Sequence, residues 1–241
     1  LETSNYTYVT DNVKVEETLP IASHKIGLEK IAKMLMDDEI GVIKSTKEIQ
    51  AVGHRVVHGG SSFSAPTLIT AEVKDEIRKL CEIAPLHNPA HLEGIIVAEE
   101  IFVEAKQIIV FDTAFHQTMP EVAYKYAIPN HFLTENKLRV YGFHGTSHKY
   151  VSEKAIEYLK SQNKPYKNMI TVHLGNGCSI TAVKDGKCIG RICKKGNGPN
   201  EYVNPVALSA DSGKLYNGCV KEEQSALYLF CCSACRGAEN C

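Results

Sequence analysis

Two histidines stand four residues apart in the stretch YGFHGTSHKY, residues 141–150. His144 and His148 could share a metal ion if both lay on one face of a helix. The Gly-Thr-Ser step between them instead predicts a helix start there, with His144 in the preceding turn and His148 a surface or packing residue of the helix. Because helix N-termini favour anions, His144 could then donate a hydrogen bond to a phosphoryl oxygen. We favour this interpretation over zinc, since no HExxH glutamate and no third ligand accompany the pair.

A glycine-rich turn follows an apolar run in MITVHLGNG, residues 169–177. Gly175 and Gly177 would let backbone N–H groups approach phosphate oxygens closely. The alternative is an ordinary glycine turn into the next strand, and a short glycine motif does not decide between the two.

Three further polar side chains occur near the ends of predicted segments. Arg55 has apolar neighbours and is predicted to be buried, so it needs an anionic partner, either a substrate carboxylate or a structural salt bridge. Asp112 could hold Mg²⁺ or a proton, or cap the next turn. His87 could donate to a phosphoryl group or organise a helix start at Asn88. Cations, one carboxylate and flexible backbone together suit phosphoryl transfer.

Composition is that of an ordinary globular protein. The 241 residues are 44% apolar and carry a formal net charge of −1. This charge gives no electrostatic reason to expect a nucleic-acid partner. No run approaches the roughly 20 apolar residues of a membrane span, and the N-terminus lacks the features of a signal peptide. We therefore expect a cytoplasmic protein with no membrane partner.

The elements that must position these residues alternate between strand-like and helical segments. Helices are predicted at 24–37, 72–83, 87–102 and 145–160, and strand-like segments at 49–60, 107–112, 169–177 and 179–189. The last of these is a hairpin that turns at Asp185–Gly186. Asn88 is predicted to cap its helix, with Pro89 at the first helical position. This is an α/β plan, in which ligands bind beyond the carboxyl ends of strands.

Five segments together resemble the acetate kinase family. They are AVGHRVVHGG, APLHNP, VFDTAFHQTMP, YGFHGTSHKYV and HLGNGCSITAV, and they follow the family's order and approximate spacing over residues 15–189. The resemblance implies part of the actin-like fold of the acetate and sugar kinase superfamily, which has two ribonuclease-H-like α/β domains. Residues 1–150 would form the acetate-side domain without its first strand, residues 151–189 the start of the nucleotide-binding domain, and residues 190–241 an unmatched tail.

The same resemblance implies reversible transfer of the γ-phosphoryl group of ATP to acetate, which gives acetyl phosphate and ADP. It also implies Mg²⁺ as cofactor and a homodimer. We assign no side chain as a metal ligand. Arg55 would hold the carboxylate and acyl phosphate, and Asp112 would be the active-site acid that organises this region. His144 would stabilise the transferring phosphoryl group, with His87 assisting. The ATP phosphates would meet His173, Leu174, Gly175, Asn176 and Gly177. The pocket for the acetate methyl group would be lined by Val57, Leu86 and Phe143.

The resemblance is lost after about Gly190. Eight of the nine cysteines also fall in residues 178–241. The tail could be a zinc or disulfide module, a lineage-specific extension or a shifted reading frame. We favour the shifted frame because composition and resemblance change at the same point, and we expect the tail to form no compact domain and to carry no zinc.

The family's first phosphate-binding turn, its second arginine and most of its nucleotide-binding domain find no match. We therefore expect this chain to be an inactive fragment. Two alternatives stay open: a propionate or butyrate kinase of the same superfamily, and a non-catalytic remnant that binds ligand.

Overall fold

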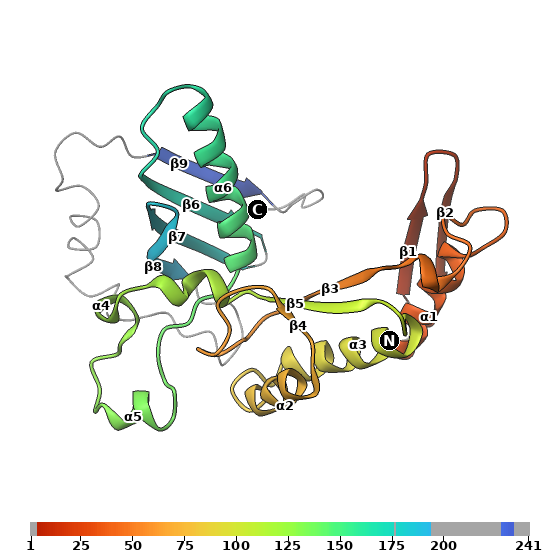
Figure 1. The fold of residues 1–241 in the computed structure, drawn as a ribbon, viewed down its shortest axis with the longest axis horizontal. Helices are drawn as coiled ribbons and strands as arrows, with labels where there is room; N and C mark the ends of the chain where they lie inside the picture. Colours follow the sequence, from red (N-terminus) through yellow and green to blue (C-terminus); the bar gives the residue numbers. More distant parts are fainter. Residues whose placement is uncertain (1–3, 176, 194–227, 234–241) are drawn as a thin grey trace. The chain divides into compact units, whose positions relative to one another are not determined.

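The computed structural model describes residues 4–175, 177–193 and 228–233 (Figure 1). The chain forms two compact units. The first comprises the residues up to Val56 together with Pro66–Val110, and the second comprises Val57–Ala65 and the residues from Phe111 onward. Each unit therefore contains two separate stretches of sequence.

The first unit contains a hairpin, a small sheet and three helices. The hairpin pairs β1 (Ser4–Val9) with β2 (Lys14–Leu19) in antiparallel fashion. The sheet has the order β3-β5-β4, formed by β3 (Ala51–Val56), β5 (Lys106–Phe111) and β4 (Thr67–Leu68). The helices are α1 (His24–Leu35), α2 (Ala71–Leu80) and α3 (Asn88–Ile101).

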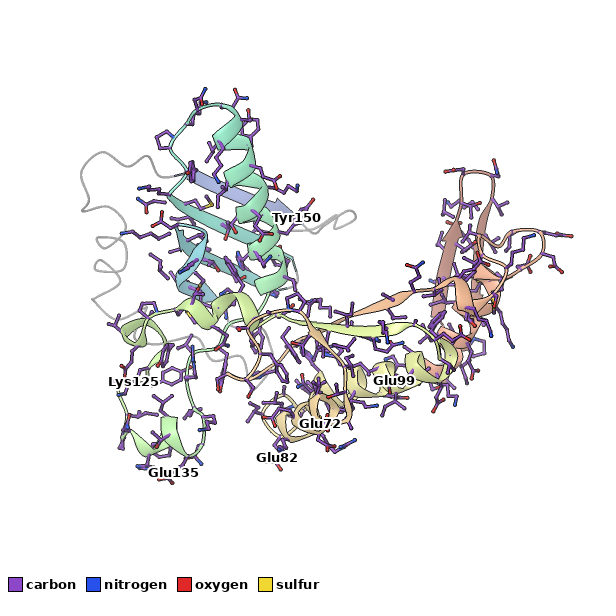
Figure 2. All side chains as sticks on the ribbon, in the orientation of Figure 1. Glu72, Glu82, Glu99, Lys125, Glu135 and Tyr150 are labelled. Carbon is purple, nitrogen blue, oxygen red and sulfur yellow. The ribbon has the colours of Figure 1, made fainter. Side chains whose placement is uncertain are left out.

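Local sequence explains where the helices of the first unit begin and how they pack. The Thr70 hydroxyl accepts a hydrogen bond from the Val73 N–H group and caps α2, as such residues do at helix starts. Ala98 and Phe102 of the α3 region pack with Ala32 of α1 in one apolar cluster. At the surface Lys74 of α2 pairs with Glu99 of α3 at 2.7 Å, and Glu99 is marked in Figure 2.

The predicted cap of α3 is wrong by one residue. His87 precedes the helix, Asn88 is its first residue, and Pro89 falls in the first turn. No side chain caps this end. Asn88 is fully buried, so its amide lies inside the fold instead of bending back over the helix start.

The second unit is built on a four-stranded sheet with the order β8-β7-β6-β9. Its strands are β6 (Asn168–Leu174), β7 (Cys178–Lys184), β8 (Lys187–Cys193) and β9 (Tyr228–Ser233). β6, β7 and β8 are antiparallel neighbours, whereas β9 is parallel to β6. Asp185 and Gly186 have φ angles of 49° and 76°, which confirms the predicted hairpin turn.

One long helix, α6 (Gly145–Ser161), packs on this sheet (Figure 1). Ala155 of α6 joins Met169 of β6 and Val183 of β7 in a buried apolar cluster. The solvent side of the helix carries Tyr150, whose exposed fraction is 62% (Figure 2). Three short elements precede α6: the 3₁₀ helix Ala114–Thr118, α4 (Glu121–Tyr124) and α5 (His131–Thr134).

Two described segments of the predicted tail join this sheet. Residues 190–193 extend β8, and β9 supplies the outer strand beside β6. The remaining tail lies outside the described residues, so its predicted behaviour stays a prediction. The predicted domain boundaries likewise stay predictions. None of the described helices combines the length and apolar character that crossing a membrane requires.

Candidate active site

A buried carboxylate anchors the start of α6. Asp112 is fully buried. Its Oδ1 accepts a hydrogen bond from the Thr146 hydroxyl at 3.1 Å, and its Oδ2 accepts one from the His144 backbone N–H group at 3.4 Å. The Gly145 N–H group donates to the Asp112 carbonyl at 3.0 Å. A negative charge is stabilised at this position because it faces a helix N-terminus.

His144 lies before α6, as the sequence predicts, and occupies its cap position, whereas Thr146 and Ser147 lie inside the first turn instead of capping it. The His144 backbone is left-handed, with φ at 60°. The imidazole Nδ1 lies 2.8 Å from the Ser179 hydroxyl. The ring stacks on that of His173, with 4.2 Å between ring centroids and an interplanar angle of 20°. His173 is itself held by the Ser147 hydroxyl, 3.0 Å from its Nδ1.

The predicted glycine turn lies beside the His144 ring. A Cβ atom on Gly177 would come within 2.8 Å of Cε1 and 2.9 Å of Nε2 of His144. The Gly175 N–H group donates to the Gly177 carbonyl at 3.0 Å and closes the turn. Leu174, which ends β6, is exposed, and Asn176 lies outside the described residues. A glycine at position 177 is therefore what lets the turn approach the Nε2 edge of His144.

His148 lies one turn into α6 and points into the protein. Its exposed fraction is 1%, so it is a packing residue and the predicted surface alternative is wrong. Its Nδ1 lies 2.7 Å from the Thr171 hydroxyl and its Nε2 2.8 Å from the Ser179 hydroxyl. Burial, reinforced by nearby Arg191, lowers the pKa of His148 to about 3. The ring is therefore neutral, and both of its nitrogens are occupied by hydroxyl groups.

Metal ligands do not cluster in the part of the chain that the structure describes. No group of three or more His, Cys, Asp or Glu side chains there is arranged to hold a metal ion. The His144–His148 pair is joined through the Ser179 hydroxyl instead.

The sequence predicted no role for His116, whose ring contacts the backbone just before His144. It is fully buried, and burial holds its pKa well below the usual value. Its Nε2 lies 3.1 Å from the Phe143 carbonyl and its Nδ1 3.2 Å from the Cys188 Sγ. Burial raises the pKa of the Cys188 thiol to about 12. The thiol therefore stays protonated and can donate to Nδ1, while Nε2–H donates to the carbonyl that precedes His144.

The two predicted pocket residues of the second unit are half-buried. The Phe143 ring meets His58 edge-on, with centroids 5.8 Å apart, and Val57 directly precedes His58 in the chain. Burial lowers the pKa of His58 to about 4. The His58 ring beside Phe143 is therefore neutral at neutral pH.

Three predicted site residues belong to the first unit. Arg55 is exposed, so the prediction that it is buried is wrong. Exposure alternates along β3, and the next residue, Val56, is the one that is fully buried, because successive side chains of a strand point to opposite faces. Leu86, with an exposed fraction of 66%, and the exposed His87 lie in the turn before α3.

Comparison with known proteins identifies the relatives of this chain. The acetokinase family profile matches residues 2–196, which is a wider span than residues 15–189. A curated acetate kinase from Flavobacterium johnsoniae is 68% identical over 189 residues, which are 78% of this chain and 47% of that protein. Another from Brachyspira hyodysenteriae is 52% identical over 176 residues. The chain spans about half the length of the curated relatives it matches.

Solved structures agree with this family. The crystal structure of Porphyromonas gingivalis acetate kinase matches with a TM-score of 0.72 and 38% identity, over 89% of this chain and 56% of that one. A propionate kinase from Francisella tularensis matches with a TM-score of 0.71 and 39% identity, over 88% and 55%. The likeness confirms the predicted fold class, a partial actin-like α/β kinase fold. On sequence and on structure alike, the chain belongs to the acetokinase family.

Proposed function

We propose that the protein of which this chain is part transfers the γ-phosphoryl group of ATP to acetate, reversibly, giving acetyl phosphate and ADP. The observation that carries the proposal is the arrangement at the start of α6. There the Nε2 edge of His144 faces the glycine turn at Gly177, beside the buried Asp112. The names of the curated relatives support acetate as the acceptor.

His144 supplies the donor that this reaction needs. A phosphoryl group in transfer carries negative charge on its equatorial oxygens, and catalysis consists mostly of positioning and neutralising that charge. An imidazole N–H group at a helix N-terminus offers a fixed donor inside a favourable field. Stacking on His173 and the hydrogen bond to Ser179 fix the ring, so little reorganisation is needed when charge develops.

Asp112 fixes the backbone at His144. Its carboxylate accepts hydrogen bonds from the Thr146 hydroxyl and the His144 backbone N–H group. A carboxylate is the kind of hard oxygen ligand that Mg²⁺ takes together with substrate phosphates, so Asp112 fits the proposed cofactor in kind. Mg²⁺ bound with ATP would neutralise charge on the phosphate oxygens.

Arg55 is proposed as the clamp for the acetate carboxylate. A planar guanidinium group can bind a carboxylate through two parallel hydrogen bonds. Its exposure on β3 agrees with a substrate role better than with a buried structural salt bridge. His87, the pocket residues and the glycine turn keep their predicted roles within the same proposal, as do a homodimer and a cytoplasmic location.

Propionate is the second candidate acceptor. The Francisella tularensis propionate kinase matches the fold about as well as the Porphyromonas gingivalis acetate kinase does. The two acids differ by one methylene group, for which an apolar pocket discriminates only about 10- to 200-fold.

The test is a calorimetric titration of the chain with acetyl phosphate and, separately, with ATP. We expect acetyl phosphate to bind and His144→Ala to weaken that binding. The control is His131→Ala, which removes an exposed histidine of α5 in the same unit and should leave binding unchanged. Equal binding by both variants would refute the role of His144, and stronger binding of propionyl phosphate would favour the second acceptor.

A further inference from the structure

A chain of hydroxyl and imidazole groups runs from the middle of β6 to His144. The Thr171 hydroxyl lies 2.7 Å from Nδ1 of His148. Nε2 of His148 lies 2.8 Å from the Ser179 hydroxyl, which in turn lies 2.8 Å from Nδ1 of His144. All four residues belong to the second unit. Thr171, His148 and Ser179 are almost completely buried, so water cannot substitute for a missing partner.

The direction of these hydrogen bonds follows from Thr171. Its side chain is fully buried, and among the described residues His148 is the partner recorded for its hydroxyl group. A buried hydroxyl hydrogen without an acceptor is costly, so Thr171 must donate to Nδ1 of His148. Because His148 is neutral, its single proton then sits on Nε2 and is donated to the Ser179 oxygen. The Ser179 hydroxyl is left to donate to Nδ1 of His144.

The opposite direction fails at the same residue. If Nδ1–H of His148 donated to Thr171, then Ser179 would donate to Nε2 of His148 and Nδ1–H of His144 would donate to Ser179. Each distance would still be satisfied, but the buried Thr171 hydroxyl hydrogen would lose the acceptor that the structure gives it. The proton of a neutral His144 would also lie on Nδ1, which leaves Nε2 without a donor.

We propose that Thr171, His148 and Ser179 form a directional relay that fixes His144 in the tautomer with its proton on Nε2. They are positioning residues, since they act through His144. Stacking of His173 on His144 restrains the plane of the ring, while the relay decides which nitrogen carries the proton. The donor thereby points to the glycine turn before any ligand arrives.

The role of His144 in phosphoryl transfer rests on the proposed function, whereas the direction of the hydrogen bonds in the relay does not. This separation allows the two to be tested independently. The deciding measurement is nitrogen NMR of the 241-residue chain with ¹⁵N-labelled histidine at neutral pH. We expect protonated Nε2 and unprotonated Nδ1 in both His144 and His148. A proton on Nδ1 of either ring would overturn the relay.

Two pairs of variants test the connections between the residues. Ser179→Ala should turn the single tautomer of His144 into a mixture, whereas Ser152→Ala should not. Ser152 is an equally buried serine of α6 whose hydroxyl donates to the Lys149 carbonyl, outside the relay. Thr171→Val should disturb the tautomer of His148, and Thr171→Ser should preserve it. An unchanged His144 spectrum in folded Ser179→Ala protein would contradict the proposal, and the unsubstituted chain decides the matter if that variant does not fold.

Adding acetyl phosphate to the labelled chain separates the two proposals. If both hold, the Nε2–H resonance of His144 shifts on binding. If the tautomers are as expected and acetyl phosphate leaves His144 unmoved, the proposed function fails and the relay stands. If His144 responds but His148 carries its proton on Nδ1, the relay fails and the proposed function stands.

Discussion

Burial separates the histidines of the second unit by their chemistry. His58 and His148 have pKa values of about 4 and about 3, and the pKa of His116 is also well below the usual value. Burial is the leading cause in each case, because it penalises the charged imidazolium. These three rings serve as neutral hydrogen-bonding and packing groups. His144 and His173 are half-buried, and His144 is the ring whose Nε2 edge faces the glycine turn.

The neutral histidines predict that the fold weakens in acid. Their pKa values are lower in the folded than in the unfolded chain, so the unfolded chain takes up protons first as the pH falls below about 6.5. Their stabilising contribution is complete above that pH and is lost toward pH 4 and below. Between pH 7 and pH 5, His58 and His148 should each lower the free energy of unfolding by about 2 kcal/mol. Urea denaturation at the two pH values measures the difference.

His58→Gln should remove its share of this pH dependence, while His131→Gln, at an exposed position, should not. Equal free energies of unfolding at the two pH values would show that these histidines are not held neutral.

Arg55 gives a second prediction at the residue scale. In an active full-length protein that carries this chain, Arg55→Ala should lower kcat/KM by about 10²–10³, as loss of a charge-stabilising donor does. Arg55→Lys should also be impaired because the planar fork is lost. Steady-state kinetics with varied acetate measures both.

Arg78→Ala is the matched control for Arg55. Arg78 is an exposed arginine of α2 that pairs with Asp75, and its loss should leave kcat/KM unchanged. Near-normal turnover of Arg55→Ala would remove Arg55 from the site.

The start of α6 is the element on which the site depends. It needs a glycine at position 145, since a Cβ atom there would lie 2.0 Å from the Asp112 carbonyl oxygen. No real Cβ contact is so short, so any larger residue must displace the backbone that carries both Asp112 and His144. The positions of Asp112 and His144 therefore depend on this backbone contact as well as on the hydrogen bond between them.

Gly145→Ala should therefore destabilise the protein by about 1–3 kcal/mol, as overpacking does. The control is Gly94→Ala in α3, where nothing lies within 4 Å of the added Cβ atom. That change should stabilise by about 0.5–1 kcal/mol, because alanine is the better helix former. Chemical denaturation measures both, and an unharmed Gly145→Ala protein would contradict the close approach.

Sequence patterns predicted the elements better than the contacts among their side chains. The Asp185–Gly186 turn and the helix after His144 follow from local chemistry, and both are confirmed. The sequence did not show on which face of β3 Arg55 lies. Apolar residues occur on both faces of that strand, so the alternation of buried and exposed side chains is not visible in the sequence. The contact of His116 with Cys188 joins residues 72 positions apart, and no local pattern carries such information.

At the scale of the whole molecule, the chain spans about half the length of the curated relatives it matches. Phosphoryl transfer needs charge neutralised on several sides at once, and losing one donor costs about 10²–10³ in rate. We therefore predict no measurable acetate kinase activity from the 241 residues alone. ADP formation with acetate, Mg²⁺ and ATP measures this, with a full-length relative as positive control. A rate within tenfold of the control would contradict the prediction.

The parallel pairing of β9 with β6 also bears on how the second unit folds during synthesis. β6, β7 and β8 follow one another closely in the chain and can pair as soon as they are made. β9 arrives much later, and contacts distant in sequence form slowly. Until then the backbone groups of β6 on that side form an open edge, which can capture a strand from another copy. When many copies are synthesised rapidly, β6 strands of different copies should therefore pair and aggregate. Slow synthesis should favour pairing of β6 with β9 of the same chain.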